Sequence, residues 1–107
     1  MHIQIVTFAV SGLTEEGYLE AGAQLAPAIA EMPGLLAKIW LAEPEGNGYG
    51  GVYLWRDRAA MEGYMASDLF QAIAAFPHFT DVASHDFAVH DDLTRVTQPG
   101  LPVLALA

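Results

Sequence analysis

Histidine is the side chain best suited to proton transfer near neutral pH, because its imidazole ordinarily titrates there. Of four histidines, His85 lies inside an otherwise apolar segment and is the first candidate for a general base, with His78 the second. A histidine at the edge of the core, held by one hydrogen bond, is the structural alternative for His85. His85 and His90 are five residues apart on one predicted strand and point to opposite faces. Because no carboxylate completes a metal-binding triad with them, we expect no metal site.

Aromatic side chains are concentrated on the two central predicted strands and on the segments that cover them. Several alternate along one strand and share a face, with Gly51 between the first two. A gap at Gly51 beneath the flanking rings could admit a planar ligand, which stacks on aromatic faces. Packing in the core and at an interface is the alternative role for these rings. The candidate substrate-binding residues are Trp40, Tyr49, Tyr53, Trp55 and Tyr64.

Composition excludes several other kinds of chemistry. The chain has no cysteine, which rules out disulfides, thiolate catalysis and cysteine-ligated metal clusters. Its net charge of −9 repels phosphate backbones, so we expect no nucleic-acid partner. No apolar run reaches the roughly 18 residues of a membrane span, and no secretory signal is visible, so we expect no membrane association and a cytoplasmic location. The glycines between residues 46 and 51 lie in a predicted hairpin and do not match a dinucleotide-binding motif.

The elements that must position these residues follow from hydrophobic patterning and caps. Strands are predicted at 2–10, 35–42, 49–56 and 79–90. Thr14 is a predicted cap for a helix that ends near residue 31, and Pro27 should kink or shorten that helix near Ala23. Asp57 caps a second helix, which restarts as a short helix at 69–75. The pair Gly50 and Gly51 indicates a bulge or a close backbone approach.

This order of elements predicts an α+β fold, the ferredoxin-like split βαβ plan, as one domain over residues 1–107. Its four-stranded antiparallel sheet carries both helices on one face. All four strands are apolar on both faces, so packing two sheets together would bury the uncovered face. We therefore expect a homodimer. The apolar C-terminal tail, about 93–107, is either a frayed end or an arm on the partner subunit.

Several runs of the sequence resemble the YdhR-like mono-oxygenase family, over roughly residues 3–98. They are PGLLAKIW at 33–40, GGVYLW at 50–55, RAAMEGY at 58–64, FAVSG at 8–12 and VHDDLT at 89–94. The resemblance implies a dimeric α/β barrel and the oxidation of an aromatic compound without metal, flavin or haem, hence no cofactor. In such relatives the substrate carbanion reduces oxygen, and the protein contributes a pocket, a base and hydrogen bonds. The sequence departs from the family pattern at His85 and in its longer segment 70–79.

We therefore predict a cofactor-independent mono-oxygenase that acts on a small phenol, quinol or anthrone-like compound, with His85 or His78 as the base. One alternative is an isomerase, cyclase or lyase that uses the same base on a similar substrate without oxygen. Another is a dimer that binds a small molecule without catalysis.

Overall fold

Four strands form one antiparallel sheet in the computed structural model, which describes residues 1–98. The strands are β1 (His2–Val10), β2 (Leu35–Ala42), β3 (Gly48–Trp55) and β4 (Phe79–Ala88). Their order across the sheet is β2-β3-β1-β4, and every neighbouring pair is antiparallel. This arrangement confirms the predicted ferredoxin-like fold.

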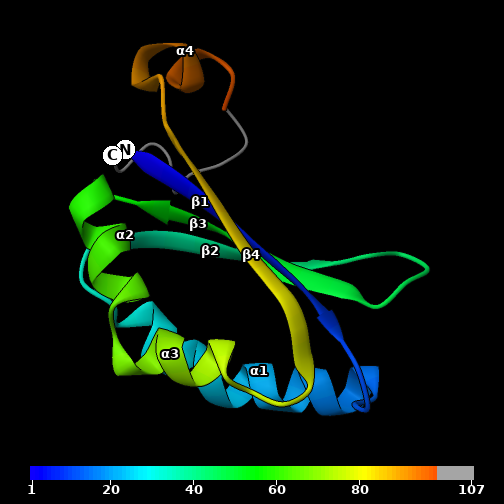
Figure 1. Ribbon diagram of the computed structural model, residues 1–107. Helices are drawn as coiled ribbons and strands as arrows, with labels where there is room; N and C mark the ends of the chain where they lie inside the picture. The colour runs from blue at the N-terminus through cyan, green and yellow to red at the C-terminus, as the bar shows by residue number, and fades with distance from the viewer. Residues whose placement is uncertain (99–107) are drawn as a thin grey trace.

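The helices are α1 (Glu15–Ala30), α2 (Arg58–Met65), α3 (Asp68–Ala74) and α4 (Asp91–Val96). Figure 1 shows α1, α2 and α3 on one side of the sheet and α4 beyond the far end of β4. None of the helices described within residues 1–98 is long and apolar enough to cross a membrane.

Short polar side chains cap the N-termini of three of these helices. Thr14 Oγ1 accepts the amide of Gly17 at 3.0 Å, and Asp57 Oδ1 accepts the amide of Ala60 at 2.8 Å. Ser67 Oγ performs the same function for α3. These bonds satisfy amides that a helix start otherwise leaves unpaired. Helix α1 continues through Pro27 to Ala30, so the proline does not end it.

The strand register separates the side chains of the sheet into two faces. Residues directly opposite each other on neighbouring strands share a face. One row of paired residues faces the helices and consists of Asp86, Gln4, Tyr53 and Lys38. The adjacent row faces away from the helices and consists of His85, Ile5, Val52 and Ile39. Ile39 and Phe87 are more than half exposed on this outer face, at 54% and 56%.

The core lies between the helix-facing side of the sheet and the three helices. Its buried residues are Val6, Ile29, Tyr53, Trp55, Met61, Tyr64 and Phe70. Gln4 is fully buried among them, and its side-chain carbonyl accepts the Trp55 indole N–H at 3.0 Å. Its amide nitrogen donates to Ser84 Oγ at 2.9 Å. One amide side chain therefore connects β1 with β3 and β4, and its polar atoms are satisfied.

The structure decides between two predicted options at Gly50 and corrects the predicted end of the last strand. The pairing register shifts in β2 and β1 rather than at Gly50, where a Cβ would clash with the Val6 carbonyl oxygen. A close backbone approach, one of the two options predicted, therefore explains this glycine. Strand β4 ends at Ala88, two residues early, and the predicted tail begins as α4. The rest of that predicted tail, 99–107, lies outside the described residues.

Candidate functional site

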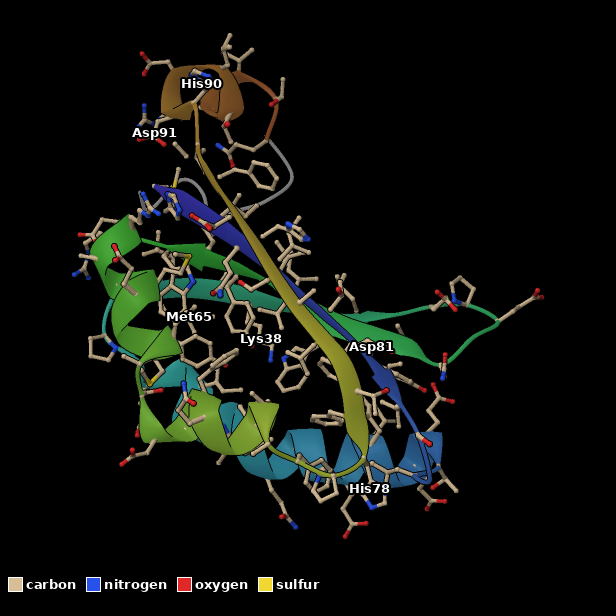
Figure 2. The ribbon with its side chains drawn as sticks, in the orientation of Figure 1. Lys38, Met65, His78, Asp81, His90 and Asp91 are labelled. Carbon is tan, nitrogen blue, oxygen red and sulfur yellow. The ribbon has the colours of Figure 1, made fainter. Side chains whose placement is uncertain are left out.

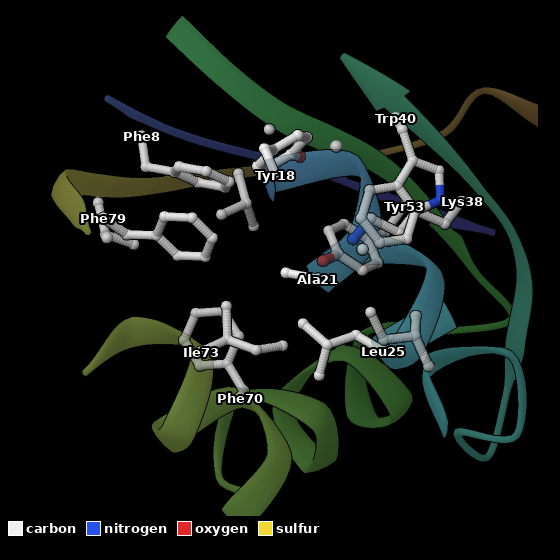
Figure 3. A pocket seen from close by; sticks show the side chains of 16 residues that line it. Phe8, Tyr18, Ala21, Leu25, Lys38, Trp40, Tyr53, Phe70, Ile73 and Phe79 are labelled. Carbon is white, nitrogen blue, oxygen red and sulfur yellow. The ribbon is translucent and has the colours of Figure 1, made fainter. Parts of the chain in front are cut away.

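An apolar cavity lies between the helix-facing side of the sheet and helices α1 and α3. Its volume is about 30 Å³, which is room for one or two water molecules. Figure 3 shows rings and aliphatic side chains from both layers around it. The lining residues are Val6, Phe8, Tyr18, Ala21, Gly22, Leu25, Ile29, Lys38, Trp40, Gly50, Gly51, Tyr53, Phe70, Ile73, Phe79 and Val82.

A larger groove of about 360 Å³ adjoins this cavity between α1 and α3. Cavity and groove share four lining residues, Ala21, Leu25, Ile73 and Phe79. A single benzene ring needs a cavity on the order of 150 Å³. Displacement of the shared side chains would join the two spaces, and the combined volume would then be large enough for an aromatic ligand.

Lys38 is the cationic side chain that enters the cavity. Its Nζ lies 3.5 Å from the centre of the Trp40 ring and 4.7 Å from the centre of the Tyr53 ring. Cations are attracted to ring faces at such distances. Figure 2 shows Lys38 in the middle of the molecule, between the sheet and the helices.

Gly51 makes this position of Lys38 possible. A Cβ on Gly51 would lie 2.6 Å from Lys38 Cε, closer than side chains pack. The lysine stem occupies the space at Gly51 where a gap for a planar ligand is predicted from the sequence. A ligand would lie next to the lysine amine instead of on the bare glycine.

Burial gives Lys38 unusual acid–base behaviour. Removal from water disfavours the ammonium and lowers the pKa of Lys38 to about 8. Within residues 1–98, no carboxylate forms an ion pair with its Nζ. Burial also raises the pKa of the Tyr18 and Tyr53 phenols, with Tyr49 and Tyr64 adding to the effect respectively. At neutral pH the lining tyrosines are therefore neutral, and Lys38 is the lining group that can change charge.

Two of the five predicted substrate-binding residues, Trp40 and Tyr53, line the cavity. The other three lie next to lining residues. The Tyr64 hydroxyl is 3.0 Å from the Tyr53 hydroxyl, and the Trp55 ring stacks parallel to the Tyr53 ring at 5.9 Å. Tyr49 packs on Tyr18 at 4.2 Å between ring centres. Their direct contact with a substrate stays a prediction.

The two predicted bases lie outside the cavity. His85 is exposed on the outer face of the sheet, because it alternates with Ser84, whose hydroxyl meets Gln4 on the helix-facing side. His78 precedes β4, and its Nδ1 lies 2.8 Å from the Ser11 carbonyl oxygen. Figure 2 places His78 at the far end of α1 from the loop that joins α1 to β2, apart from Lys38. Neither histidine would therefore contact a molecule bound in the cavity of a single chain.

The sequence contains one indication that Lys38 is a functional residue, which the predicted site residues do not include. Lys38 is the single charged residue of an otherwise apolar strand. A charge in such a strand is normally paired or functional. Within residues 1–98, no three His, Asp or Glu side chains gather as a metal site would require.

Comparison with known proteins identifies solved structures that share this fold. No curated protein matched the chain. Three solved structures share the fold: a "putative antibiotic biosynthesis monooxygenase" from Deinococcus radiodurans, the cofactor-independent oxygenase SnoaB from Streptomyces nogalater, and the heme-degrader MhuD from Mycobacterium tuberculosis. Their identities to this chain are 20%, 22% and 21%, with TM-scores of 0.70, 0.67 and 0.67. The matches cover 83%, 83% and 84% of this chain and 92%, 93% and 96% of the others.

A family model gives the more specific result. Residues 3–99 match the model described as "Putative mono-oxygenase ydhR", which spans most of the chain and agrees with the resemblance seen in its motifs. The chain therefore belongs to the ydhR mono-oxygenase family.

Proposed function

We propose that this protein is a cofactor-independent mono-oxygenase whose substrate is a small aromatic compound, such as a phenol, a quinol or an anthrone-like compound. Membership of a mono-oxygenase family supports the reaction class. The fold shared with SnoaB, a cofactor-independent oxygenase, is consistent with a reaction that needs no bound redox group. The observation that carries the proposal is a cavity walled by aromatic rings that contains a single amine.

The cavity walls favour a flat, apolar molecule. Trp40 and Tyr53 stand on the sheet side, and Phe70 and Phe79 come from the covering segments. Rings of this kind bind an aromatic ligand by stacking and edge contacts. The ligand occupies the cavity together with the adjoining groove after the shared side chains, including Ile73, have moved.

The proposed reaction requires little covalent participation from the protein. A base takes a proton from the substrate, and the resulting anion transfers electrons to O₂. When the ring CH₂ of an anthrone, or a ring C–H para to the hydroxyl of a phenol, becomes a carbonyl, one oxygen atom enters the product and the other leaves as water. The substrate supplies all four electrons, so no external reductant is needed. The apolar cavity contributes by excluding water and by stabilising the anion next to a positive charge.

Oxygen consumption tests this proposal directly. EDTA-treated protein is incubated with a panel of phenols, quinols and anthrones, and uptake of ¹⁸O₂ is compared with incorporation of ¹⁸O into product. We expect uptake above the uncatalysed rate for at least one compound. Trp40→Leu removes a lining ring and should slow uptake, whereas Arg95→Met, on the distant α4, should leave it unchanged.

The alternative functions give different results in the same experiment. Substrate loss at equal rate without oxygen would overturn the proposal in favour of an isomerase, cyclase or lyase. Ligand-induced quenching of Trp40 fluorescence with no product from any quenching compound would favour a non-catalytic binding protein.

We further propose that a second copy of the chain covers the outer face of the sheet. Ile39 and Phe87 are exposed there beside Ile3, Ile5 and Val52, and together they form an apolar surface. Sheet-to-sheet packing would remove this surface from water. A cytoplasmic location stays a prediction from the sequence.

A further inference from the structure

We propose that Lys38 binds the hydroxyl oxygen of the aromatic ligand: its amine accepts the hydroxyl proton, and the ammonium so formed pairs with the phenolate. This inference rests on the proposed function for the class of ligand. It adds to that function the residue that holds the ligand and the ionisation state in which the ligand is held.

The position of Lys38 is the first support. It is the only lysine in the chain, and it lies on the helix-facing row of the sheet beside Tyr53. Its Nζ contacts the faces of the Trp40 and Tyr53 rings, so the stem points into the cavity instead of out to solvent. If the hydroxyl oxygen of a ligand contacts this nitrogen, the aromatic ring of the ligand lies among the aromatic side chains that line the cavity.

The absence of a counter-charge in the cavity is the second support. The titratable groups that line it are Tyr18 from α1 and Tyr53 from β3, besides Lys38 itself from β2. The described lining residues contributed by β1, α3 and β4 are apolar. Both phenols remain neutral because burial raises their pKa. The ammonium formed by the proton transfer would be poorly compensated by ring faces alone, and the phenolate formed with it supplies the missing charge.

The proton step balances without any further reactant. The ligand O–H bond breaks, a new N–H bond forms on Lys38, and the two products are a phenolate and an ammonium. No electrons change hands in this step. The phenolate is also the electron-rich form that O₂ oxidises in the proposed reaction, so the same contact prepares the substrate.

Gly51 provides a variant that moves the amine without deleting it. An alanine Cβ at this position would lie 2.6 Å from Lys38 Cε and would force the flexible stem to rotate away. The Gly51 backbone does not have a positive φ, so alanine is compatible with it. Gly51→Ala therefore tests whether the position of the amine matters, whereas Lys38→Met tests whether its presence matters.

The test uses 4-nitrophenol, whose phenolate absorbs visible light, titrated with pH under nitrogen in the presence of the whole chain. In the unaltered protein we expect the bound phenol to ionise at a lower pH than free 4-nitrophenol. In Lys38→Met the apolar cavity should instead raise the ionisation pH, with affinity for the phenolate weaker by roughly 10- to 100-fold. Gly51→Ala should resemble Lys38→Met. Arg95→Met, which makes the same change in net charge far from the cavity, should resemble the unaltered protein.

Distinct results overturn the inference and the proposed function. If Lys38→Met is folded by circular dichroism and still lowers the ionisation pH, the assignment of Lys38 is wrong even if oxygen is consumed. If Lys38→Met does not fold, the same result in Gly51→Ala decides against the inference. If the phenolate binds as expected but no hydroxyaromatic compound consumes oxygen, the mono-oxygenase proposal fails and the binding role of Lys38 stands.

Discussion

Replacing Lys38 by Met should remove a pH dependence from the stability of the folded protein. In the folded chain burial lowers the pKa of Lys38 to about 8, whereas in the unfolded chain it returns to about 10.5. Between these values the unfolded chain binds more protons than the folded chain. The contribution of Lys38 to stability therefore rises as the pH increases from about 8 toward 10.5. Met carries no proton in either state, so the variant lacks this rise.

The size of the effect follows from proton linkage. One proton bound only by the unfolded chain changes the free energy of unfolding by about 1.4 kcal/mol per pH unit. Lys38 is half-buried, and water screens the exposed part of the amine. Screening narrows the gap between the two pKa values, so the folded and unfolded chains differ by less than one full proton. We therefore expect roughly half of that slope, about 0.7 kcal/mol per pH unit, in the unaltered protein.

Urea denaturation at a fixed protein concentration measures this difference. The unaltered protein, Lys38→Met and Arg95→Met are compared at several pH values from about 8 to below 10. The range stops there because the raised pKa values of Tyr18 and Tyr53 reverse the trend above pH 10, where the folded chain holds more protons. We expect parallel slopes for the unaltered protein and Arg95→Met, and a flatter slope for Lys38→Met. Equal slopes for all three would refute the view that burial perturbs Lys38.

Three further predictions concern other parts of the structure. Gly51→Ala should fold but consume oxygen as slowly as Lys38→Met, because its Cβ displaces the lysine stem; full activity in the oxygen electrode would contradict this. Tyr64→Phe removes the hydroxyl that lies 3.0 Å from the buried Tyr53 hydroxyl and should cost about 1 kcal/mol in urea denaturation. An unchanged midpoint would show that the pair contributes nothing. Phe87→Glu should convert the proposed dimer to a monomer in analytical ultracentrifugation, because it places a charge on the exposed apolar sheet face. A sedimentation profile equal to that of the unaltered protein would argue against packing through this face.

Local sequence signals explain why most of the fold was predictable. Strands β1 and β2 begin and end where their apolar runs do. The predicted caps Thr14 and Asp57 begin helices as expected, since the geometry of a cap depends only on nearby residues. Helix α4 was missed because its N-cap, His90, makes no side-chain cap bond and the helix is only six residues long. Such a short helix carries no apolar periodicity to recognise.

The candidate site was only partly predictable, because its composition depends on which face of the sheet each residue occupies. An apolar strand with polar neighbours reveals its buried face by alternation, but strands that are apolar on both faces do not. Ser84 and Asp86 flank His85, so β4 has no clear alternation of apolar and polar residues to show which face His85 occupies. The apolar residues beside His85 on the neighbouring strands, Ile5 and Val52, belong to the outer face.

The strand register supplies this missing information. Once the face of one residue is known, the register determines the face of each residue paired with it. Once Tyr53 is known to face the helices, its partners Gln4 and Lys38 must face them too, whereas His85 pairs with Ile5 and must face away. A shift of one residue in the pairing of β2 with β3 would put Lys38 on the outer face and move the amine out of the cavity. The location of Lys38 therefore depends on the pairing of β2 with β3, in which Lys38 lies opposite Tyr53. That pairing can be read from the structure but not from the apolar sequence of β2, which has no alternation to indicate it.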